Sequence, residues 1–234
     1  MQRLLYKTIR YVLILWFKAQ AARAAKDILT SVYEKEQVAG ILREYWKCYL
    51  LLKPEVPPMP TLGGSLMVHL AAMSTAFYQE MTKRGHSQES ATQLFYGIAW
   101  RVYQKMGKLS WRLAGIGNQA GYGRLLRATR LFRTFPFNSP SYIWHDAEPD
   151  GSIVGFDCLK CPVAEYFNTR NLSEFCTATW CALDFPLAEM WEAELVRAGS
   201  IAGGARKCDF RWVPKSELVH GAILASINDK IQRS

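Results

Sequence analysis

Cysteines clustered in the back of the chain are the residues best suited to chemistry. Six cysteines occur, and all except Cys48 lie between residues 158 and 208. A secreted disulfide framework is usually shorter and richer in cysteine, so this cluster favours buried thiols, a metal site or a nucleophile. One CxxC pair occurs without a second, which argues against a zinc ribbon. Three thiols with a carboxylate could still bind zinc or iron, and the candidate ligands are Cys161, Cys181 and Cys208.

The candidate catalytic residues are Cys161, Cys181 and Asp184. Pro162 suits the first turn of a helix, which places Cys161 at a helix amino end, where the helix dipole is expected to lower the thiol pKa. Cys181 and Asp184 lie three residues apart on one helical face, so the carboxylate could act as a general base or orient a water. Either thiol could attack a substrate directly, or a thiolate-bound metal could polarise a water. A single cysteine is usually a small buried hydrophobe, and only the clustering favours a site here.

Arginines supply candidate anchors for a negatively charged substrate. No acid occurs between Ser90 and His145, and this segment carries four arginines at every third residue: Arg124, Arg127, Arg130 and Arg133. On a helix this spacing forms a basic stripe, which is usually a solvated face but could also receive a carboxylate. Arg197, or an arginine of the stripe, is expected to hold a substrate carboxylate in a bidentate pair. Tyr78 and Arg211 are further candidates for substrate binding.

The composition is that of a globular chain. Its 234 residues are 50% hydrophobic and 21% charged, which suits one domain over residues 1–234 and excludes a mainly disordered state. No apolar run approaches the ~20 residues of a spanning helix, which excludes a polytopic membrane protein. The net charge is +9, and it is unevenly placed: residues 1–150 carry +10 and residues 151–234 carry −1. A basic surface can attract nucleic acid, anionic lipid or small anions. Because no nucleic-acid motif accompanies it, we expect no nucleic-acid partner.

The amino terminus is ambiguous between a leader and a first helix. An apolar run, Tyr11–Phe17, follows basic residues and precedes small ones, which outlines a signal peptide. The run is short and is closed by Lys18, so an amphipathic helix continuing to about Lys35 is favoured. We therefore expect a cytoplasmic protein. A helix lying on a membrane surface, through residues 1–35, is the alternative.

Periodicity predicts helices in the front of the chain. The first helical region, residues 1–53, ends at the proline-rich segment 54–60. Residues 61–137 form a second region that opens with an antiparallel pair, one helix from Thr61 to Gly85 and one from Ser87 to Gly107. His69, near the apolar row of the first, is expected to be a hydrogen-bonded core residue, with a catalytic role as the less favoured alternative.

The pattern becomes strand-like in the cysteine-rich region, residues 141–234. We expect a hairpin around residues 148–151, a helix from Pro162, a helical stretch over 172–190 that is broken or bent near Pro186, a strand pair at 195–197 and 208–213, and a closing helix over 216–232. The predicted fold is α+β: a helical front half packed on an antiparallel sheet of about four strands.

Three motifs in the back half occur in an order more specific than any CxxC: FDCLKCPVAEYF (156–167), FCTATWCALDFPLAEMW (175–191) and LVRAGSIAGGARKCDFRW (195–212). With the upstream FPFNSPSYIW and the helices from Thr61, they make residues 60–213 resemble the L-2-amino-thiazoline-4-carboxylic acid hydrolase family. Ser200 stands where the family usually has threonine. Cys158 and Cys176 are not family positions.

The resemblance implies a hydrolase that acts at the carbon–nitrogen bond of a cyclic amidine. Water would add at the C=N carbon of a small carboxylate-bearing ring and give an N-carbamoyl amino acid, which is N-carbamoyl-L-cysteine in the named reaction. We expect no nucleotide cofactor. The alternative function is a non-catalytic α+β module that binds a small ligand or a tetrapyrrole, with the cysteines mostly in the core.

Overall fold

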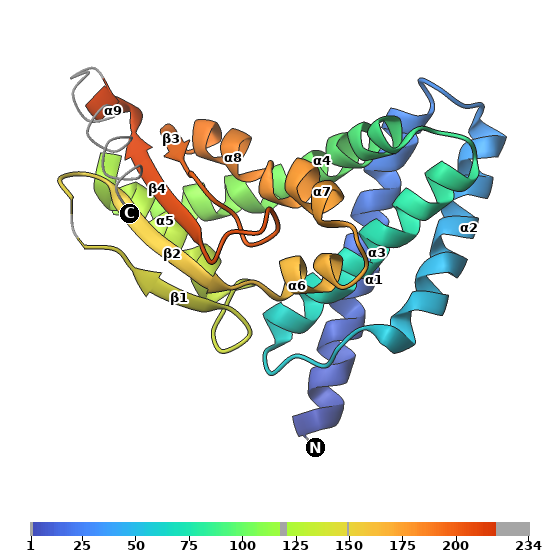
Figure 1. Ribbon diagram of the computed structural model, residues 1–234, viewed down its shortest axis with the longest axis horizontal. Coiled ribbons are helices and arrows are strands. Elements are labelled where there is room, and N and C mark those ends of the chain that lie inside the picture. Colours follow the sequence, from blue (N-terminus) through green and yellow to red (C-terminus); the bar gives the residue numbers. More distant parts are fainter. Residues whose placement is uncertain (1, 118–120, 149, 219–234) are drawn as a thin grey trace.

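Helices fill the front of the chain and a small sheet follows, in the predicted α+β arrangement (Figure 1). The computed structural model describes residues 2–117, 121–148 and 150–218. Helices α1 to α4 pack together at one end of the molecule, and α5 packs against strands at the other. These helices are α1 (Gln2–Leu29), α2 (Lys35–Leu52), α3 (Leu62–Lys83), α4 (Gln88–Ala114) and α5 (Gly121–Thr134).

The first helical region contains two helices, and the predicted first helix is present but ends six residues before the expected Lys35. Helix α1 ends at Leu29, and α2 begins at Lys35. A capping box starts α2: the Glu34 side chain accepts from the backbone, and the Glu34 N–H donates to Gln37 Oε1 at 3.0 Å. This exchange satisfies N–H groups that a helix start leaves without partners. After α2, a short 3₁₀ turn, η1 (Lys53–Glu55), leads into the proline-rich segment.

Helix α3 passes through the interior and begins after Thr61, where the sequence predicts its start. The Thr61 hydroxyl accepts from the Gly64 N–H at 3.0 Å. A Cβ on Gly64 would lie 2.2 Å from Ser141 Oγ, so glycine lets the chain before the sheet approach this helix closely. His69 is buried, and the Tyr49 hydroxyl lies 3.1 Å from its Nδ1. His69 is therefore the hydrogen-bonded core residue that its position favours.

Helix α4 continues past Gly107, which the sequence predicts as its end, to Ala114. Gly107 is instead a contact point between helices. A Cβ there would lie 2.4 Å from Met190 Cε and 2.5 Å from Leu187 Cδ1. The Gly107 carbonyl also accepts from Trp191 Nε1 at 3.0 Å. A glycine inside a helix often has such a packing reason, which its sequence position alone does not reveal.

Among the described residues, four strands form an antiparallel sheet in the order β1-β2-β4-β3. Both predicted strand pairs are present, with the bounds β1 (Ile143–Asp146), β2 (Val154–Lys160), β3 (Ala193–Val196) and β4 (Cys208–Pro214). The register places Phe156 opposite Phe210 and Cys158 opposite Cys208. Side chains alternate along a strand, so these four residues share one face of the sheet.

The segment between β2 and β3 crosses from the sheet to the helices and back. It contains α6 (Pro162–Asn168), α7 (Ser173–Cys176), a π-helical turn η2 (Thr177–Cys181) and α8 (Asp184–Met190). The predicted helical stretch over 172–190 is therefore present and broken, but the break is not at Pro186. It precedes Asp184, and Pro186 lies in the first turn of α8, where a missing N–H breaks no hydrogen bond of the helix. π-Helical turns often occur at functional sites.

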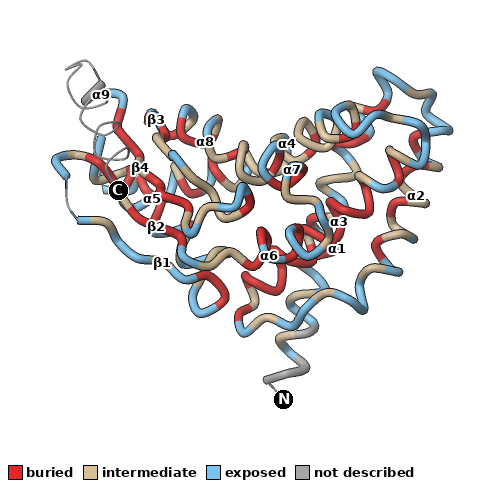
Figure 2. Tube along the Cα trace, in the orientation of Figure 1, coloured by how far each residue is buried: buried red, intermediate tan, exposed pale blue. Residues whose placement is uncertain are grey.

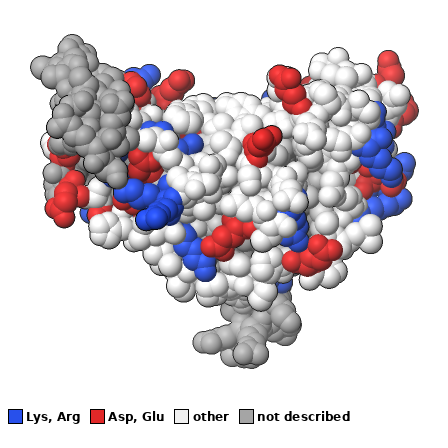
Figure 3. Space-filling model, viewed as in Figure 1, with Lys and Arg blue, Asp and Glu red and all other residues white. Residues whose placement is uncertain are grey.

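One continuous set of buried residues joins the helices to the sheet. It extends from Ile14 in α1 to Trp212 in β4, and Figure 2 shows the buried positions facing inward on both sides. On the face seen in Figure 3, basic and acidic groups lie mainly towards the edges, and the centre is largely uncharged. No helix within the described ranges is long and apolar enough to cross a membrane. Beyond α9 (Lys215–Leu218), the predicted closing helix lies outside the described residues.

Candidate active site

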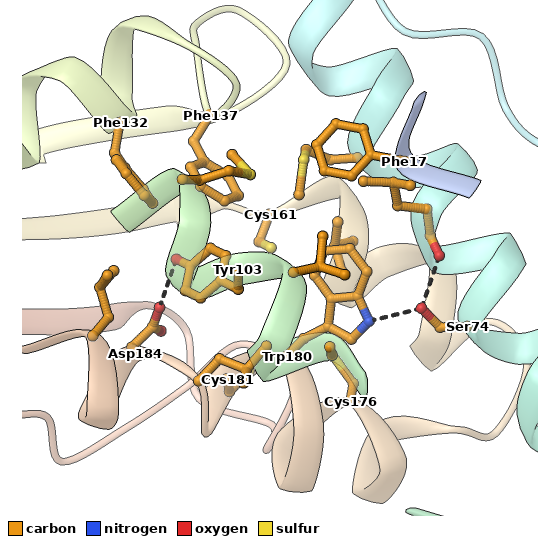
Figure 4. Close-up of a pocket in the computed structure, with 18 of the residues that line it drawn as sticks. Phe17, Ser74, Tyr103, Phe132, Phe137, Cys161, Cys176, Trp180, Cys181 and Asp184 are labelled. Carbon is orange, nitrogen blue, oxygen red and sulfur yellow. Dashed lines mark hydrogen bonds between the residues drawn. The ribbon is translucent and has the colours of Figure 1, made fainter. Parts of the chain in front are cut away.

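A cavity of about 220 Å³ lies between the helices and the sheet. Its wall is mostly aromatic and aliphatic, and the front helices, β2, β4 and the segment from α7 to α8 contribute to it. Five of the six cysteines line it: Cys158, Cys161, Cys176, Cys181 and Cys208. Figure 4 shows Cys161, Cys176 and Cys181 with Asp184 and Tyr103 around this space. The fold thus brings the clustered thiols to one apolar cavity.

An ion pair lies at one side of the cavity. Arg197 Nη1 donates to Asp184 Oδ2 at 2.8 Å, and Arg197 Nη2 donates to the Cys181 carbonyl at 3.0 Å. The Tyr103 hydroxyl donates to Asp184 Oδ1 at 3.5 Å (Figure 4). The side chains of Arg197 and Asp184 are only 7% and 18% exposed. Arg197 therefore joins the Cys181 backbone to the Asp184 carboxylate and holds the predicted pair together.

Burial raises the pKa of Asp184 to about 6, although Arg197 and Tyr103 stabilise the carboxylate and act in the opposite direction. Removing a carboxylate from water disfavours its charged form. A carboxyl group with a pKa near neutral can both donate and accept a proton at physiological pH, which is the property that general acid–base catalysis requires.

Cys181 is the cavity thiol whose pKa is lowered. The main cause is a hydrogen bond from the Cys176 thiol, with smaller help from Arg197 and from a hydrogen bond to Ser200, while burial and the Asp184 charge oppose it. Donation to Cys181, together with burial, raises the pKa of Cys176. Of these two thiols, Cys181 is therefore the one that we expect to ionise first. Thiolates are the nucleophilic form of cysteine.

The other three cavity thiols have raised pKa values. Cys161 is the residue before α6 and its sulfur accepts from the Ala164 N–H at 3.5 Å, yet burial raises its pKa well above the usual range. The prediction that the helix start lowers this pKa is therefore wrong, because the loss of water outweighs the backbone N–H groups of Ala164 and Val163, which lower it. Burial also raises the pKa of Cys158, and that of Cys208 to about 11.

The described residues do not fit a metal ion. They contain no group of three or more His, Cys, Asp or Glu side chains placed so that they could hold one. The candidate ligands Cys161, Cys181 and Cys208 line the cavity without forming such a group. A bound zinc or iron stays a prediction, and no step below depends on it.

A family model described as L-2-amino-thiazoline-4-carboxylic acid hydrolase matches residues 66–212, more than half of the chain. The chain belongs to this family. The matched segment contains every candidate catalytic residue and all of the sheet except the last two residues of β4. No curated protein and no solved structure is significantly similar to the chain.

Of the three predicted substrate-binding residues of this hydrolase-family chain, one lines the cavity and two do not. Arg197 lines the cavity. Tyr78 and Arg211 are not among the lining residues: the Tyr78 ring packs 4.7 Å from that of Phe175. Arg211 donates to Asp157 at 2.9 Å. Phe156 and Cys158, on either side of Asp157 in β2, line the cavity, so the Asp157 side chain lies on the opposite face of the sheet. Arg211 thus serves the far face of the sheet, and the structure does not bring it to the site.

Two arginines of the basic stripe on α5 donate to backbone carbonyls of α4 and of the turn that follows it. Arg124 donates to the Trp111 carbonyl at 3.1 Å, and Arg127 donates to the Ile116 carbonyl at 2.7 Å. Arg133 lines the cavity and donates to Asp146 at 2.5 Å. Of the four stripe residues, only Arg133 is thus placed to meet a ligand in this family's cavity.

Two polar residues of the site, Tyr103 and Ser74, lie outside the quoted family motifs. Tyr103 comes from the apolar face of α4, and Ser74 Oγ accepts from Trp180 Nε1 at 3.2 Å across the cavity wall (Figure 4). Trp180, Tyr142 and Trp212 also line the cavity and lie inside the motifs, where nothing marked them as site residues. Ser200 could have been recognised: it stands where the family usually has threonine, so a hydroxyl that can bond Cys181 is kept.

Proposed function

We propose that this chain hydrolyses a five-membered cyclic amidine of the 2-amino-thiazoline-4-carboxylate type. In the overall reaction, the oxygen of one water bonds to the amidine carbon and the ring carbon–sulfur bond breaks. The products are a carbamoyl group on nitrogen and a free thiol, so the thiazoline named by the family would give N-carbamoyl-L-cysteine. Membership of the family supports hydrolysis of this ring.

The observation that carries the proposal is the position of Arg197, which binds the Cys181 carbonyl and the Asp184 carboxylate at the wall of the cavity. It holds a candidate nucleophile near a candidate acid–base group, and covalent catalysis uses that arrangement. The lowered pKa of Cys181 and the raised pKa of Asp184 support the same roles. The family match does not favour a purely ligand-binding module.

In the first half of the proposed reaction, the Cys181 thiolate attacks the amidine carbon. The ring carbon–sulfur bond then breaks, and protonated Asp184 gives its proton to the departing ring sulfur. An amidine carbon bonded to Cys181 and to two nitrogens is left. Arg197 positions both reacting groups, because it binds the Asp184 carboxylate and the Cys181 carbonyl at once.

In the second half, ionised Asp184 accepts a proton from water as the water oxygen bonds to the same carbon. The carbon–sulfur bond to Cys181 breaks and restores the thiolate, and Asp184 is again protonated. A pKa of about 6 suits a residue that must act first as an acid and then as a base.

A substrate carboxylate has one candidate anchor that is not fully committed. Both terminal nitrogens of Arg197 already have acceptors within the protein. Arg133 also lines the cavity, but its partner Asp146 has a side chain that is 72% exposed. Since exposed ion pairs are weak, a substrate carboxylate could replace Asp146 on Arg133.

Turnover of 2-amino-thiazoline-4-carboxylate by the purified protein tests the proposal. Cys181→Ser and Asp184→Asn should each lower kcat/KM by about a hundredfold or more, because each removes a group that acts on the reacting atoms. Cys48→Ser is the matched control, since Cys48 bonds Gln79 and does not line the cavity. Melting temperatures would show that all variants fold. Full activity in folded Cys181→Ser would refute the proposal.

A further inference from the structure

One wall of the cavity comes from outside the family-matched segment. The match begins at residue 66, yet α1 and α2 contribute Phe17, Ala21, Ala25, Leu42 and Tyr45 to the lining. Phe17 is buried, and Figure 4 shows its ring beside the space that Cys161 and Trp180 also border. The two front helices therefore shape the cavity of this chain in a way that the family motifs do not describe.

The rest of the wall is equally apolar. Aromatic rings from α3, α4, α5 and the sheet surround the space, among them Phe77, Phe95, Phe132, Phe156 and Phe210. A small, charged ring such as the unsubstituted thiazoline carboxylate would leave most of these surfaces without a partner. An apolar substituent would cover them and be removed from water, which is the main source of favourable binding free energy in such cavities.

Two buried hydrogen-bond donors at the cavity wall have no partner. The Tyr142 hydroxyl and Trp212 Nε1 belong to side chains only 2% and 3% exposed, and neither atom finds a hydrogen bond in the described structure. Both residues line the cavity, and the groups whose charge acts most on the Tyr142 hydroxyl are the lining thiols of Cys161 and Cys158. A buried donor without a partner is costly and rare. An acceptor atom of a ligand would remove that cost.

We infer that the cavity selects a heterocycle with a bulky apolar substituent, which packs against Phe17 while Tyr142 and Trp212 donate hydrogen bonds to acceptor atoms of the ligand. The inference rests on the proposed function for the identity of the reactive ring. It assigns the substrate class of that site, and it gives α1 and α2 the role of determining specificity.

Calorimetric titration of the Cys181→Ser protein with a graded ligand series tests the substrate class. The series is 2-amino-thiazoline-4-carboxylate with hydrogen, methyl, propyl or benzyl at ring position 5. Each added methylene that enters the apolar wall should tighten binding by about fourfold. Affinity that stays level or falls with substituent size would overturn the inference, and so would binding of no member of the series.

The two proposals can fail separately. If the wild-type protein hydrolyses the unsubstituted ring but affinity does not rise with substituent size, the inferred substrate class is wrong and the proposed function is unaffected. If the series shows the gain but the wild-type protein hydrolyses none of its members, the cavity chemistry is right and the function is wrong.

Variants in α1 locate the substituent. Phe17→Ala should reduce the gain from propyl and benzyl groups more than it changes the affinity for the unsubstituted ring. Leu15→Ala is the matched control, because Leu15 lies on the same helix, is 38% exposed and does not line the cavity. An equal loss of affinity for the propyl and benzyl ligands in both variants would contradict the placement of the substituent against Phe17.

Tyr142→Phe tests the unpartnered donor and separates a binding role from a structural one. Removing a buried hydroxyl that has no partner should leave the melting temperature unchanged or raise it. The affinity for the benzyl ligand should nevertheless fall by about five- to tenfold, as expected for one lost hydrogen bond. A lower melting temperature with unchanged affinity would show that the hydroxyl serves the fold.

A separate observation concerns the outer face of α1. Large apolar side chains are exposed along one stripe at helical spacing: Leu5, Ile9, Val12 and Trp16. Helix α4 runs antiparallel beside it, as the Gln20–Lys105 and Asp27–Arg101 contacts show. Continuing this register places the exposed Leu109 and Leu113 next to the stripe, with the exposed Lys108 and Arg112 among them.

We propose that this face of α1 and α4 lies on an anionic lipid bilayer. Apolar residues flanked by basic ones are the pattern of a helix at a membrane surface. The charge argues against a second copy of this chain as the occupant, because two basic faces would repel each other.

Co-sedimentation with lipid vesicles tests this surface. The protein should bind vesicles that contain phosphatidylserine at low salt, and bind less at about 0.5 M salt or to pure phosphatidylcholine. Val12→Ser with Trp16→Ser should weaken binding by about tenfold. Leu51→Ser, at a 78% exposed position of α2, is the control. No binding at low salt would overturn the proposal, as would a dimer that only the α1 variant disrupts.

Discussion

Replacing Cys176 by alanine should make Cys181 less reactive at neutral pH. The Cys176 thiol donates the hydrogen bond that contributes most to lowering the pKa of Cys181. Without it, burial and the Asp184 charge remain, and both raise that pKa. The thiolate would then form only at higher pH. Alkylation of Cys181 should therefore slow at pH 7 and recover at high pH, where the thiol is ionised in both proteins.

The size of the effect follows from the hydrogen bond that is lost. A hydrogen bond to a charged group contributes about 1.5–3 kcal/mol, and each 1.36 kcal/mol changes an equilibrium about tenfold. The alkylation rate of Cys181 at pH 7 should fall by about ten- to a hundredfold. Iodoacetamide labelling across a range of pH, with each modified peptide quantified by mass spectrometry, measures the pH at which each cysteine reacts at half its maximal rate.

Two variants control this experiment. Cys176→Ser keeps an O–H donor and should restore part of the reactivity. Cys48→Ala removes a thiol outside the cavity and should change nothing. An unchanged midpoint for Cys181 in Cys176→Ala would refute the reasoning, as would a wild-type protein in which Cys161 reacts faster than Cys181.

Three further predictions concern other parts of the structure. Folding raises the pKa of Asp184 to about 6, so its protonated form favours the folded state below about pH 4 and this contribution is lost as the pH rises through 6. Chemical denaturation should show the unfolding free energy of the wild type falling by about 3 kcal/mol relative to Asp184→Asn over that range. Gly107→Ala should lower the free energy of unfolding by about 1–3 kcal/mol, because the new Cβ meets Met190. Gly40→Ala, where a Cβ meets nothing closer than 4.0 Å, should raise it by about 0.5–1 kcal/mol, and an equal effect of the two would contradict the packing argument. Arg133→Ala should raise KM for the carboxylate substrate at least about tenfold while changing kcat little, and a fall in kcat alone would place the carboxylate elsewhere.

Local patterns predicted the elements well because each element carries its own periodicity. The α3–α4 pair and both strand pairs could be recognised from apolar spacing and capping residues such as Thr61 and Ser87. The errors fall where contacts distant in sequence decide the outcome. Gly107 resembles a helix end, but it is a glycine because α8 packs on it. Pro186 resembles a helix break, but it fits the first turn of α8.

Sequence reasoning could bring Cys181, Asp184 and Arg197 together, but it could not find Tyr103 or the electrostatics of the site. Cys181 and Asp184 could be paired from their spacing, and Arg197 lies beside them in the fold. The pKa of Cys161 depends on how deeply the start of α6 is buried, which no local pattern encodes. Likewise, Cys176 is not a family position, and only its contact with Cys181 reveals a role for it.

Trapping the covalent intermediate tests the central claim most directly. The wild-type protein would be quenched with acid during turnover of 2-amino-thiazoline-4-carboxylate, and its intact mass and peptides measured. We predict a mass increase equal to one intact substrate, because attack and ring opening lose no atoms. The adduct should map to Cys181 and be absent from Cys181→Ser. Turnover with Cys181 unmodified in the wild type and dispensable in the variant would contradict the account.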